Sequence, residues 1–492
     1  MRLRRPGRWA VVALAAVLVL AVGVYAGLRV WHVYRFEGQA MPVPGEVPTL
    51  DSTPATPPSA PQAGSGPFVA GVSDDGRFFV DHGGDPVLVQ GDSPWSLLAA
   101  MTLPQAEDYW EQRAGEGVNA AIVSLVGART NGGSESGATV DGIVPFLGGL
   151  PFSPGSVTRP NPAYFDRAHD VVAAAAEQGI TVFLYAVDGW TIGHAFSPDS
   201  VGQCAAFGRY VGRTFADLPN VVWAVGGDYA QQDPPSDVDR CFDAVRVGLA
   251  SSGDDRPFSI QFTSPLTTSR DSPYWRTRVG WSFVYSYVPT YAGVLAAYAQ
   301  TPPIPAVLGE SNYEGMNLQP DTPPTTEESL RRQVLWALTS GAAGDFYGSA
   351  DWEFLPGWED RLDRPGLRQV AVARAAIASL RWWELVPDTQ DAFVTSGRGT
   401  PFTPDQPPVD VLDDDYATAA RTSDGREAVV YVPTSRTITL DLARLSGRPV
   451  AAWVDPTDGS RHPVPLTPSL TTPGPNAGGD EDWLLVVEQA AG

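Results

Sequence analysis

The stretch VVWAVGGDY, residues 221–229, contains the pattern that decides the fold of this chain. Five apolar residues form an unbroken run, and two glycines, an aspartate and a tyrosine follow it. A strand that is buried on both faces of a parallel sheet has such a run, whereas a half-exposed strand alternates. Two parallel strands must be joined by a crossover, usually a helix. The stretch therefore predicts one unit of an α/β sheet, with polar residues where the strand ends.

The same unit recurs along the middle of the chain. Helix starts are indicated by Thr102-Leu103-Pro104 and by Asn161-Pro162, and Gly117 and Gly179 mark helix ends. We expect eight strands, at residues 87–90, 120–124, 181–186, 221–225, 258–262, 282–286, 306–308 and 344–347. Eight such units over about 300 residues favour a (β/α)8 TIM barrel. A doubly wound open sheet is the alternative, but no G-x-G-x-x-G motif follows the first strand.

The segments that flank this region have different compositions. Residues 389–492 contain short strand-like runs between turn signals such as Ser423-Asp424-Gly425, which predicts a small all-β sandwich domain. Residues 37–66 contain seven prolines and almost no large apolar side chain, which predicts an extended linker. We therefore expect an N-terminal anchor in residues 1–36, the linker in 37–66, the barrel in 67–388 and the sandwich in 389–492.

The N-terminus has the pattern of an export signal. Four arginines within the first eight residues precede an uncharged stretch at residues 9–28. Twenty helical residues span about 30 Å, the thickness of the hydrocarbon core, and a basic cluster stays on the cytoplasmic side. This predicts a transmembrane helix that anchors the chain in the cell membrane, with the N-terminus inside and residues 37–492 outside. A secreted chain, cleaved after Val24-Tyr25-Ala26, is the alternative.

Charge and composition exclude several classes of protein. The net charge is -23, which argues against nucleic-acid binding. All 33 basic residues are arginine, so enzymes that need a lysine, such as Schiff-base aldolases and P-loop ATPases, are excluded. The five histidines form no H-E-x-x-H motif, and we predict no metal site and no cofactor. Cys204 and Cys241 could form a disulfide in an exported protein or remain two buried thiols. No pattern indicates an oligomeric state.

Carboxylates and aromatic side chains follow most of the expected strands. The C-terminal ends of all strands in a barrel open onto one face, where active sites lie. Aromatic rings stack on sugars, and hydrolysis of a glycosidic bond needs two carboxyl groups. We therefore predict a carbohydrate site in which Asp228 and Glu310 face each other across the barrel mouth. The expected substrate-binding residues are Asp92, Trp95, Asp188, Trp190, Tyr229, Tyr287, Tyr313, Glu314 and Trp352.

Three stretches resemble the apiosidase-like glycoside hydrolases. They are GDSPW at 91–95, VVWAVGGDY at 221–229 and VLGESNYEG at 307–315, and the resemblance covers residues 68–388. GREAVVYVP at 425–433 and AAWVDPTDG at 451–459 are similar to the collagen-binding-type β-domain that follows the barrel in that family. The resemblance implies a retaining hydrolase with Asp228 as acid/base and Glu310 as nucleophile. The chain departs from the family in its Asp-Ser-Pro-Trp motif and in a Gly/Ser-rich loop at 127–159. Both lie near the expected barrel mouth, so they bear on which sugar is preferred more than on the chemistry.

The implied activity is cleavage of a glycosidic bond in a plant or microbial polysaccharide or glycoconjugate, with the two carboxyl groups about 5–5.5 Å apart. Each residue also has a structural alternative. Asp228 could cap a helix, Glu310 could form a buried ion pair, and Asp92 could cap a turn. At the level of function, the alternative is a non-catalytic surface protein that binds carbohydrate or matrix on a degenerate barrel. An inverting hydrolase is also compatible with the fold.

Overall fold

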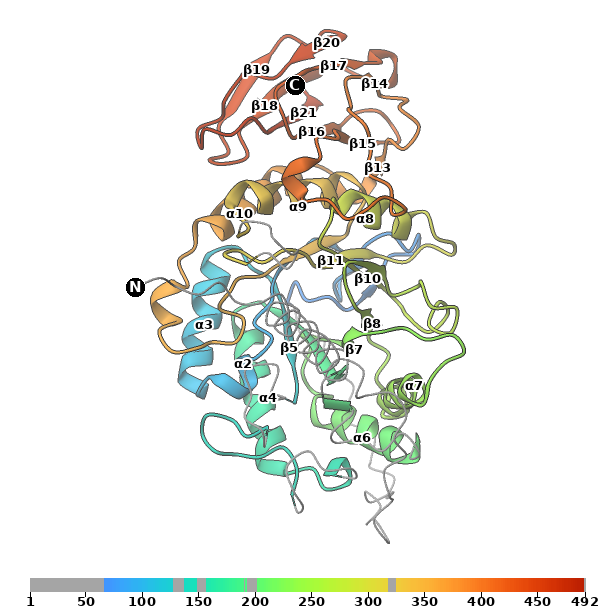
Figure 1. The fold of residues 1–492 in the computed structure, drawn as a ribbon, viewed down its shortest axis with the longest axis vertical. Coiled ribbons are helices and arrows are strands. Elements are labelled where there is room, and N and C mark those ends of the chain that lie inside the picture. The colour runs from blue at the N-terminus through green and yellow to red at the C-terminus, as the bar shows by residue number, and fades with distance from the viewer. Residues whose placement is uncertain are drawn as a thin grey trace, which may run out of the picture. The chain divides into compact units, whose positions relative to one another are not determined.

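The computed structural model describes residues 66–126, 137–147, 156–189, 191–192, 201–316 and 324–490. Its largest sheet has nine strands in the order β8-β7-β6-β5-β4-β12-β11-β10-β9 (Figure 1). The strands are β4 (Val89–Asp92), β5 (Ala120–Ser124), β6 (Thr181–Asp188), β7 (Val221–Tyr229), β8 (Phe258–Phe262), β9 (Leu266–Thr268), β10 (Ser282–Ser286), β11 (Ala306–Glu310) and β12 (Gly344–Tyr347). Eight run parallel to their paired neighbours, and β9 is antiparallel to β10. All eight predicted strands are therefore present.

The sheet closes on itself almost completely. The last parallel strand, β12, pairs with the first, β4, which differs from the open doubly wound alternative. The remaining seam lies between β8 and β10, where β9 and side-chain hydrogen bonds take the place of a ladder. Ser259 Oγ donates to the carbonyl of Trp281 (2.7 Å) and lies 2.9 Å from Ser269 Oγ. The result is a nearly closed, barrel-like sheet.

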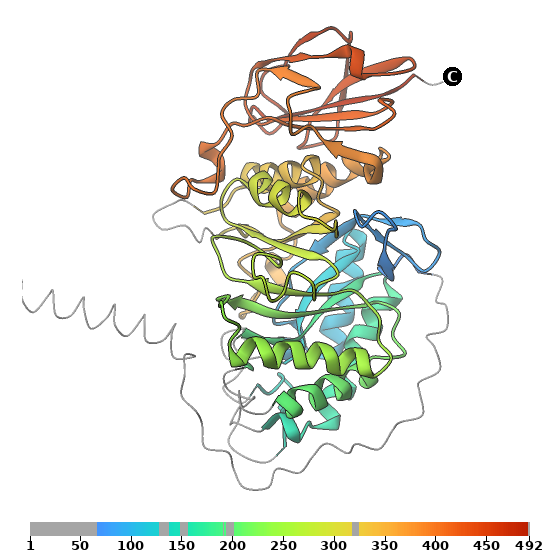
Figure 2. The same cartoon turned by 90° about the vertical axis from the view of Figure 1, so that its right-hand side faces the viewer.

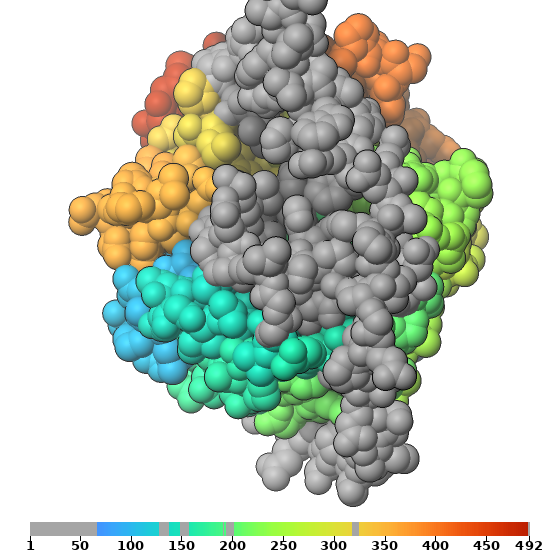
Figure 3. All heavy atoms as spheres, turned by 60° about the horizontal axis from the view of Figure 1, so that its bottom comes forward, coloured from blue at the N-terminus to red at the C-terminus, as the bar shows by residue number. Residues whose placement is uncertain are grey.

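Burial explains why these strands could be predicted. Every residue of β5, β6, β8, β10 and β11 is buried, so each strand needs apolar side chains toward both the barrel interior and the surrounding helices. The helices around the sheet are α2 (Leu97–Ala100), α3 (Leu103–Gly115), α4 (Pro162–Glu177), α6 (Val201–Thr214), α7 (Asp237–Ser251), α8 (Thr290–Tyr298), α9 (Glu327–Thr339) and α10 (Pro365–Ala378). On the face shown in Figure 3, blue atoms of the region that contains α2 and α3 border the orange-yellow segment that follows β12. Gln105 of α3 donates a hydrogen bond to Glu359 (3.2 Å).

Sequence signals for two helix starts are confirmed. Thr102 caps α3 in a reciprocal arrangement with Gln105, and Asn161 caps α4 ahead of Pro162. The disulfide alternative for the cysteines is also confirmed, since Cys204 of α6 and Cys241 of α7 are bonded.

Three smaller antiparallel sheets complete the fold. The first is β1 (Gly71–Val72), β2 (Phe79–Val80) and β3 (Pro86–Val87). In the C-terminal β-domain, a six-stranded sheet contains β13 (Leu385–Pro387), β15 (Thr418–Thr422), β16 (Ala428–Val432), β21 (Trp483–Gln489), β18 (Pro449–Val454) and β19 (Arg461–Val464). A three-stranded sheet contains β14 (Val394–Ser396), β17 (Thr437–Leu440) and β20 (Ser469–Thr471). Side chains of both sheets, among them Ile438, Leu470 and Leu485, form one core.

A second hydrophobic core crosses from the barrel-like unit into the C-terminal β-domain. It includes Leu335 and Trp336 of α9, Val370 of α10, and Val429 and Val486 of the six-stranded sheet. In both views, α8, α9 and α10 lie between the barrel-like sheet and the C-terminal strands (Figures 1 and 2). The two parts therefore share buried apolar surface rather than only a linker.

The prediction of a membrane-anchored chain requires correction. Within the ranges described above, no helix has both the length and the apolar character needed to cross a bilayer. The stretch at residues 9–28 that suggested a transmembrane helix lies outside those ranges, as does the linker at 37–65. A long uncharged run is by itself a weak signal, because export signals and anchors share it. The single-pass membrane assignment is therefore not retained.

Candidate active site

Glu310 ends strand β11 and is buried, with 8% of its surface exposed. Three side chains donate hydrogen bonds to its carboxylate. The hydroxyls of Tyr287 (2.7 Å) and Tyr285 (3.0 Å) both reach Oε1. The side-chain amide of Gln261, from β8, reaches Oε2 (2.9 Å). Buried carboxylates need such partners, and three donors fix both the position and the rotation of this one.

Asp228 comes from the end of β7, after two glycines in left-handed backbone conformations. Gly226 has φ 90° and Gly227 has φ 102°, and Asp228 itself has φ 51°. A Cβ at Gly226 would lie 2.3 Å from the carbonyl oxygen of Gln261, so only glycine allows β7 to approach β8 this closely. The local sequence thus turns the chain sharply and presents Asp228, which is exposed, at the strand end.

The two carboxyl groups influence each other's ionisation. Burial, and then the charge of Asp228, raise the pKa of Glu310 to about 8, although its three hydrogen-bond donors oppose this rise. The pKa of Asp228 is also raised by the protein atoms packed around it, while Tyr285 lowers it. Contact with solvent limits that rise, since water still hydrates the ionised form. The two groups consequently titrate as a pair that retains a proton near neutral pH.

Aromatic side chains surround this pair. Trp95 donates its indole N–H to the hydroxyl of Tyr313 (2.6 Å), and its ring lies 4.8 Å from that of Tyr185. Burial and then the charge of Glu310 raise the pKa values of Tyr185 and Tyr313, and Asp228 adds to the effect in each. Trp352 packs against the same cluster. Trp95, Tyr287 and Tyr313 are therefore predicted residues that lie together with the carboxylates.

Other predicted residues have protein partners elsewhere. Asp92 forms a buried ion pair with Arg113 (2.6 Å). The carboxylate of Glu314 accepts hydrogen bonds from Tyr347 (2.6 Å) and from the N–H of Gly366 (3.1 Å) at the start of α10.

Two more predicted residues form hydrogen bonds with groups that lie a few residues farther along the chain. Tyr229 lies 2.7 Å from the hydroxyl of Ser236 and donates to Asp239 (2.9 Å), which points it toward α7. Asp188 is buried and accepts from the N–H of Thr191 (2.6 Å). Trp190 lies outside the described residues.

Three residues of the cluster were not among the predicted site residues. They are Tyr185, Gln261 and Tyr285, which lie within β6, β8 and β10 rather than after them. One signal was present, because Gln261 is a polar residue inside the apolar run FSIQF. Tyr285 and Tyr287 are two residues apart and so share a strand face, which aligns both hydroxyls with Glu310.

One pocket lies away from this cluster. It has a volume of about 520 Å³, lies at the opposite ends of β7 and β8 and includes Trp223, Asp254 and Arg256. Of its two aspartates, Asp254 is already paired, since it forms an ion pair with Arg256 and accepts a hydrogen bond from Trp223 (2.6 Å). Within the described ranges, no group of three His, Cys, Asp or Glu side chains is arranged to hold a metal ion.

Comparisons with known proteins identify the family and the fold. The family model "Apiosidase-like, catalytic domain" matches residues 73–384, and "Putative collagen-binding domain of a collagenase" matches residues 404–488. A glycoside hydrolase family 5 structure from Bacteroides vulgatus ATCC 8482 is 20% identical, with a TM-score of 0.71 over 86% of this chain and 93% of that one. A second structure, titled glycoside hydrolase, is 20% identical, with a TM-score of 0.70 over 86% of this chain and 97% of that one.

These structural likenesses concern the fold, and a search of curated proteins finds no match. The catalytic-domain model, however, covers more than half of the 492 residues and includes both carboxylates and all the strands that position them. The chain belongs to the apiosidase-like family of glycoside hydrolase folds.

Proposed function

We propose that this protein is a retaining glycosidase on a (β/α)8 barrel, with Asp228 as acid/base and Glu310 as nucleophile. The observation that carries the proposal is the pair of carboxyl groups at the ends of β7 and β11, of which Glu310 is buried and held by three hydrogen-bond donors while burial and the charge of Asp228 raise its pKa. Retaining hydrolysis needs one carboxyl group that donates a proton and a second that attacks the anomeric carbon.

The hydrogen bonds suggest how the two roles are divided. Glu310 has three donors, which stabilise its ionised form and hold it in one orientation for attack. In the productive form Glu310 is ionised and the proton of the pair is on Asp228, which is more exposed and can protonate the leaving oxygen. The single bond to Oε2, compared with two to Oε1, leaves Oε2 as the better nucleophile.

The second step uses the same groups in reverse. Once Glu310 is esterified to the sugar, its negative charge is lost and no longer favours a proton on Asp228. The pKa of Asp228 then falls, and the ionised carboxylate can take a proton from the attacking water. Water attack breaks the bond between Glu310 and the sugar, and Asp228 is left protonated for the next cycle.

Substrate contacts are proposed from the aromatic cluster and from polar atoms without protein partners. Trp352, which is only half-buried, offers aromatic surface for a sugar ring, and it packs on the cluster that contains the buried Trp95 and Tyr313. Among the described residues, no partner lies within hydrogen-bonding distance of Tyr185 Oη or Gln261 Oε1, although both are buried. Substrate hydroxyls, or water held by them, would satisfy these atoms. For Asp92 and Glu314 we propose structural roles, because their carboxylates already have protein partners.

A screen of aryl glycosides with the full chain tests the proposal. Glu310→Gln should lower kcat at least about 10⁴-fold, because no other group can form the covalent intermediate. The matched control is Glu314→Gln, which removes a carboxylate four residues away that binds Gly366 and Tyr347. Asp228→Ala should lose activity and recover part of it with azide, which needs no general base. Activity that survives Glu310→Gln would contradict the assignment and favour a different nucleophile.

The non-catalytic alternative makes a different prediction. A carbohydrate-binding protein on a degenerate barrel would retain glycan binding and show no turnover of any aryl glycoside. The burial of a carboxylate whose pKa is raised to about 8 argues against it, since binding alone gives no reason to retain so costly a group.

A further inference from the structure

We infer that the C-terminal β-domain positions the nucleophile, because it holds helix α9 in place and Gln333 of α9 holds the segment that follows Glu310. The inference rests on the proposed role of Glu310. It makes Gln333 a positioning residue, and it makes the β-domain part of the catalytic scaffold rather than a separable binding module.

Gln333 pairs with both main-chain polar groups of Asn312, two residues after Glu310. The N–H of Asn312 donates to Gln333 Oε1 (3.0 Å), and Gln333 Nε2 donates to the carbonyl of Asn312 (3.2 Å). The side-chain amide of Asn312 also donates to Gln333 Oε1 (3.0 Å) and reaches the carbonyl of Tyr287 (3.4 Å). The fully buried Gln333 side chain thus ties α9 to Asn312. The side chain of Asn312 links the same segment to Tyr287, which itself binds Glu310.

The opposite side of α9 binds the C-terminal β-domain through Arg331. Its guanidinium contacts Asp482 (2.7 Å) and Asp480 (2.8 Å), and the Arg331 and Asp482 side chains are fully buried. Asp482 is in turn held by the amide of Asn476 (2.8 Å). A buried arginine with its carboxylate removed would be left as an uncompensated charge. The position of α9 therefore depends on the β-domain.

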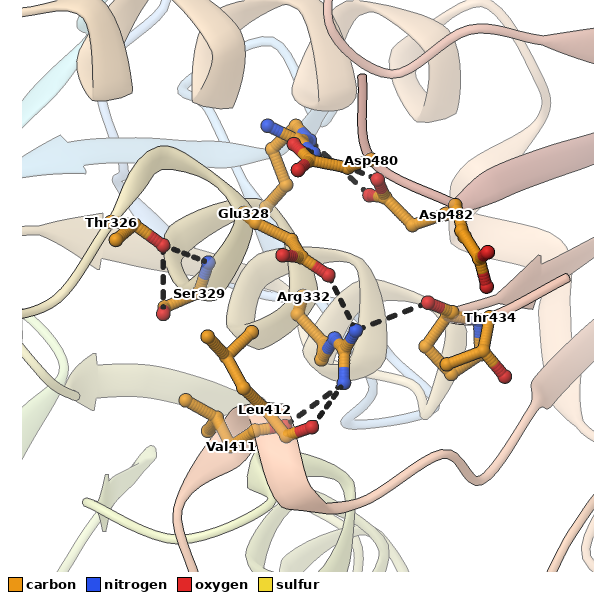
Figure 4. A network of polar contacts seen from close by, with 12 residues as sticks. Thr326, Glu328, Ser329, Arg332, Val411, Leu412, Thr434, Asp480 and Asp482 are labelled. Atoms are coloured by element: carbon orange, nitrogen blue, oxygen red, sulfur yellow. Dashed lines mark hydrogen bonds and ion pairs between the residues drawn. The ribbon is translucent and has the colours of Figure 1, made fainter. Parts of the chain in front are cut away.

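Arg332 adds a second set of contacts between α9 and the β-domain (Figure 4). Its guanidinium donates to the carbonyls of Leu412 (3.1 Å) and Asp414 (2.8 Å), and to that of Pro433 (3.1 Å). Within the helix, Glu328 balances its charge (2.6 Å).

Two residues farther along α9 continue this face. The indole N–H of Trp336 donates to the carbonyl of Tyr416 (2.7 Å), and the hydroxyls of Thr339 and Thr418 lie 2.6 Å apart. Contacts at residues 332, 336 and 339 follow the helical spacing, so one continuous stripe of α9 faces the β-domain. The helix can shift only if many buried polar bonds break together.

Kinetics of Gln333→Met test the first link. A displacement of about 1 Å at reacting atoms can lower a rate about 100-fold. We expect kcat to fall about 10- to 100-fold with less than a twofold change in KM. Hydrogen exchange of residues 310–316 should become faster in the same variant. The matched control, Gln112→Met on α3, removes a half-buried amide that contacts Glu116 (3.3 Å) and should change neither quantity.

Asp482→Asn tests the second link and should lower kcat about 3- to 10-fold. If the β-domain acts through α9, Asp482→Asn should lower kcat only slightly further in a protein that already carries Gln333→Met, because the effects of substitutions at interacting residues do not add. The matched control is Glu488→Gln, which breaks an exposed pair with Arg461 (2.7 Å) in the same domain. If Asp482→Asn does not fold, Asp480→Asn, which is 32% exposed, replaces it.

Two results would overturn the inference. One is a Gln333→Met protein whose kcat and hydrogen exchange are both unchanged. The other is a double variant in which Gln333→Met and Asp482→Asn lower kcat independently, so that their fold-changes multiply. If the wild-type protein hydrolyses no glycoside, the proposed function fails. Hydrogen exchange of residues 310–316 then tests by itself whether the β-domain positions this segment. In that case Asp482→Asn must accelerate exchange at residues 310–316, or the inference is wrong.

Discussion

Replacing Glu310 with glutamine should make this protein more stable at alkaline pH. The native structure raises the pKa of Glu310 from its ordinary value of 4.5 to about 8, first through burial and then through the charge of Asp228. The folded state therefore binds a proton that the unfolded state releases over this pH range. The contribution of Glu310 to stability is consequently fully present below pH 4.5 and is lost as the pH rises toward 8.

The magnitude follows from the width of this window. One pKa unit corresponds to about 1.4 kcal/mol. The rise in the pKa of Glu310 from 4.5 to about 8 therefore lowers the free energy of unfolding of the wild-type protein by at most about 5 kcal/mol at pH 8, and by little at pH 5. Glutamine can keep most of the local bonds. Its carbonyl can accept from Tyr285 and Tyr287, and its NH2 can donate to Gln261 Oε1, which is buried and has no partner among the described residues.

Thermal unfolding of both proteins at pH 5, 6.5 and 8 measures the effect. We expect similar Tm values at pH 5 and a Tm of Glu310→Gln that is roughly 5–10 °C higher at pH 8, on the basis of about 2 °C per kcal/mol. Glu314→Gln is the control and should show no such gain, because that carboxylate is bonded to Gly366 and Tyr347. A Glu310→Gln protein that is equally or less stable at pH 8, or a gap that does not vary with pH, would refute the reasoning.

Three further substitutions test the site and its support. Tyr287→Phe removes a donor that lowers the pKa of Glu310, so kcat/KM should fall about 10- to 100-fold and its acidic limb should move to higher pH in a pH–rate profile. Gly226→Ala places a Cβ 2.3 Å from the carbonyl of Gln261 at φ 90° and should cost about 1–3 kcal/mol or more in urea unfolding, together with activity. Cys204→Ser with Cys241→Ser opens a bridge between residues 37 apart and should cost about 3–4 kcal/mol, with kcat unchanged at 25 °C.

The strands of the barrel-like sheet could be predicted because both of their faces are buried. The runs at 120–124, 258–262, 282–286 and 344–347 coincide with β5, β8, β10 and β12. Strand β9 could not be predicted in the same way. It has three residues, Leu266 and Thr267 are only half-buried, and it runs antiparallel in the seam between β8 and β10. Such a strand has too little apolar sequence to differ from a loop.

The residues of the site were harder to predict than the strands, because the sequence does not show where a side chain at a strand end points. Asp92 and Glu310 are each the last residue of a strand, yet Asp92 pairs with Arg113 whereas Glu310 lies among the tyrosines. Local sequence cannot distinguish these outcomes, because the partners come from other elements. Asp228 and Glu310 can be predicted from the motifs around them and from the need of glycoside hydrolysis for two carboxyl groups. Gln261 differs from the predicted residues because it lies within a strand and not after one, where a polar side chain is usually expected.

The central claim is that Glu310 attacks the anomeric carbon while Asp228 transfers the proton. The most direct test is peptide mapping by mass spectrometry after reaction with a 2-deoxy-2-fluoro analogue of the aryl glycoside that the wild-type protein hydrolyses. The account predicts one sugar per chain, attached to the peptide that contains Glu310, and no label in Glu310→Gln. Label on another residue, or hydrolysis with inversion and no covalent intermediate, would contradict it.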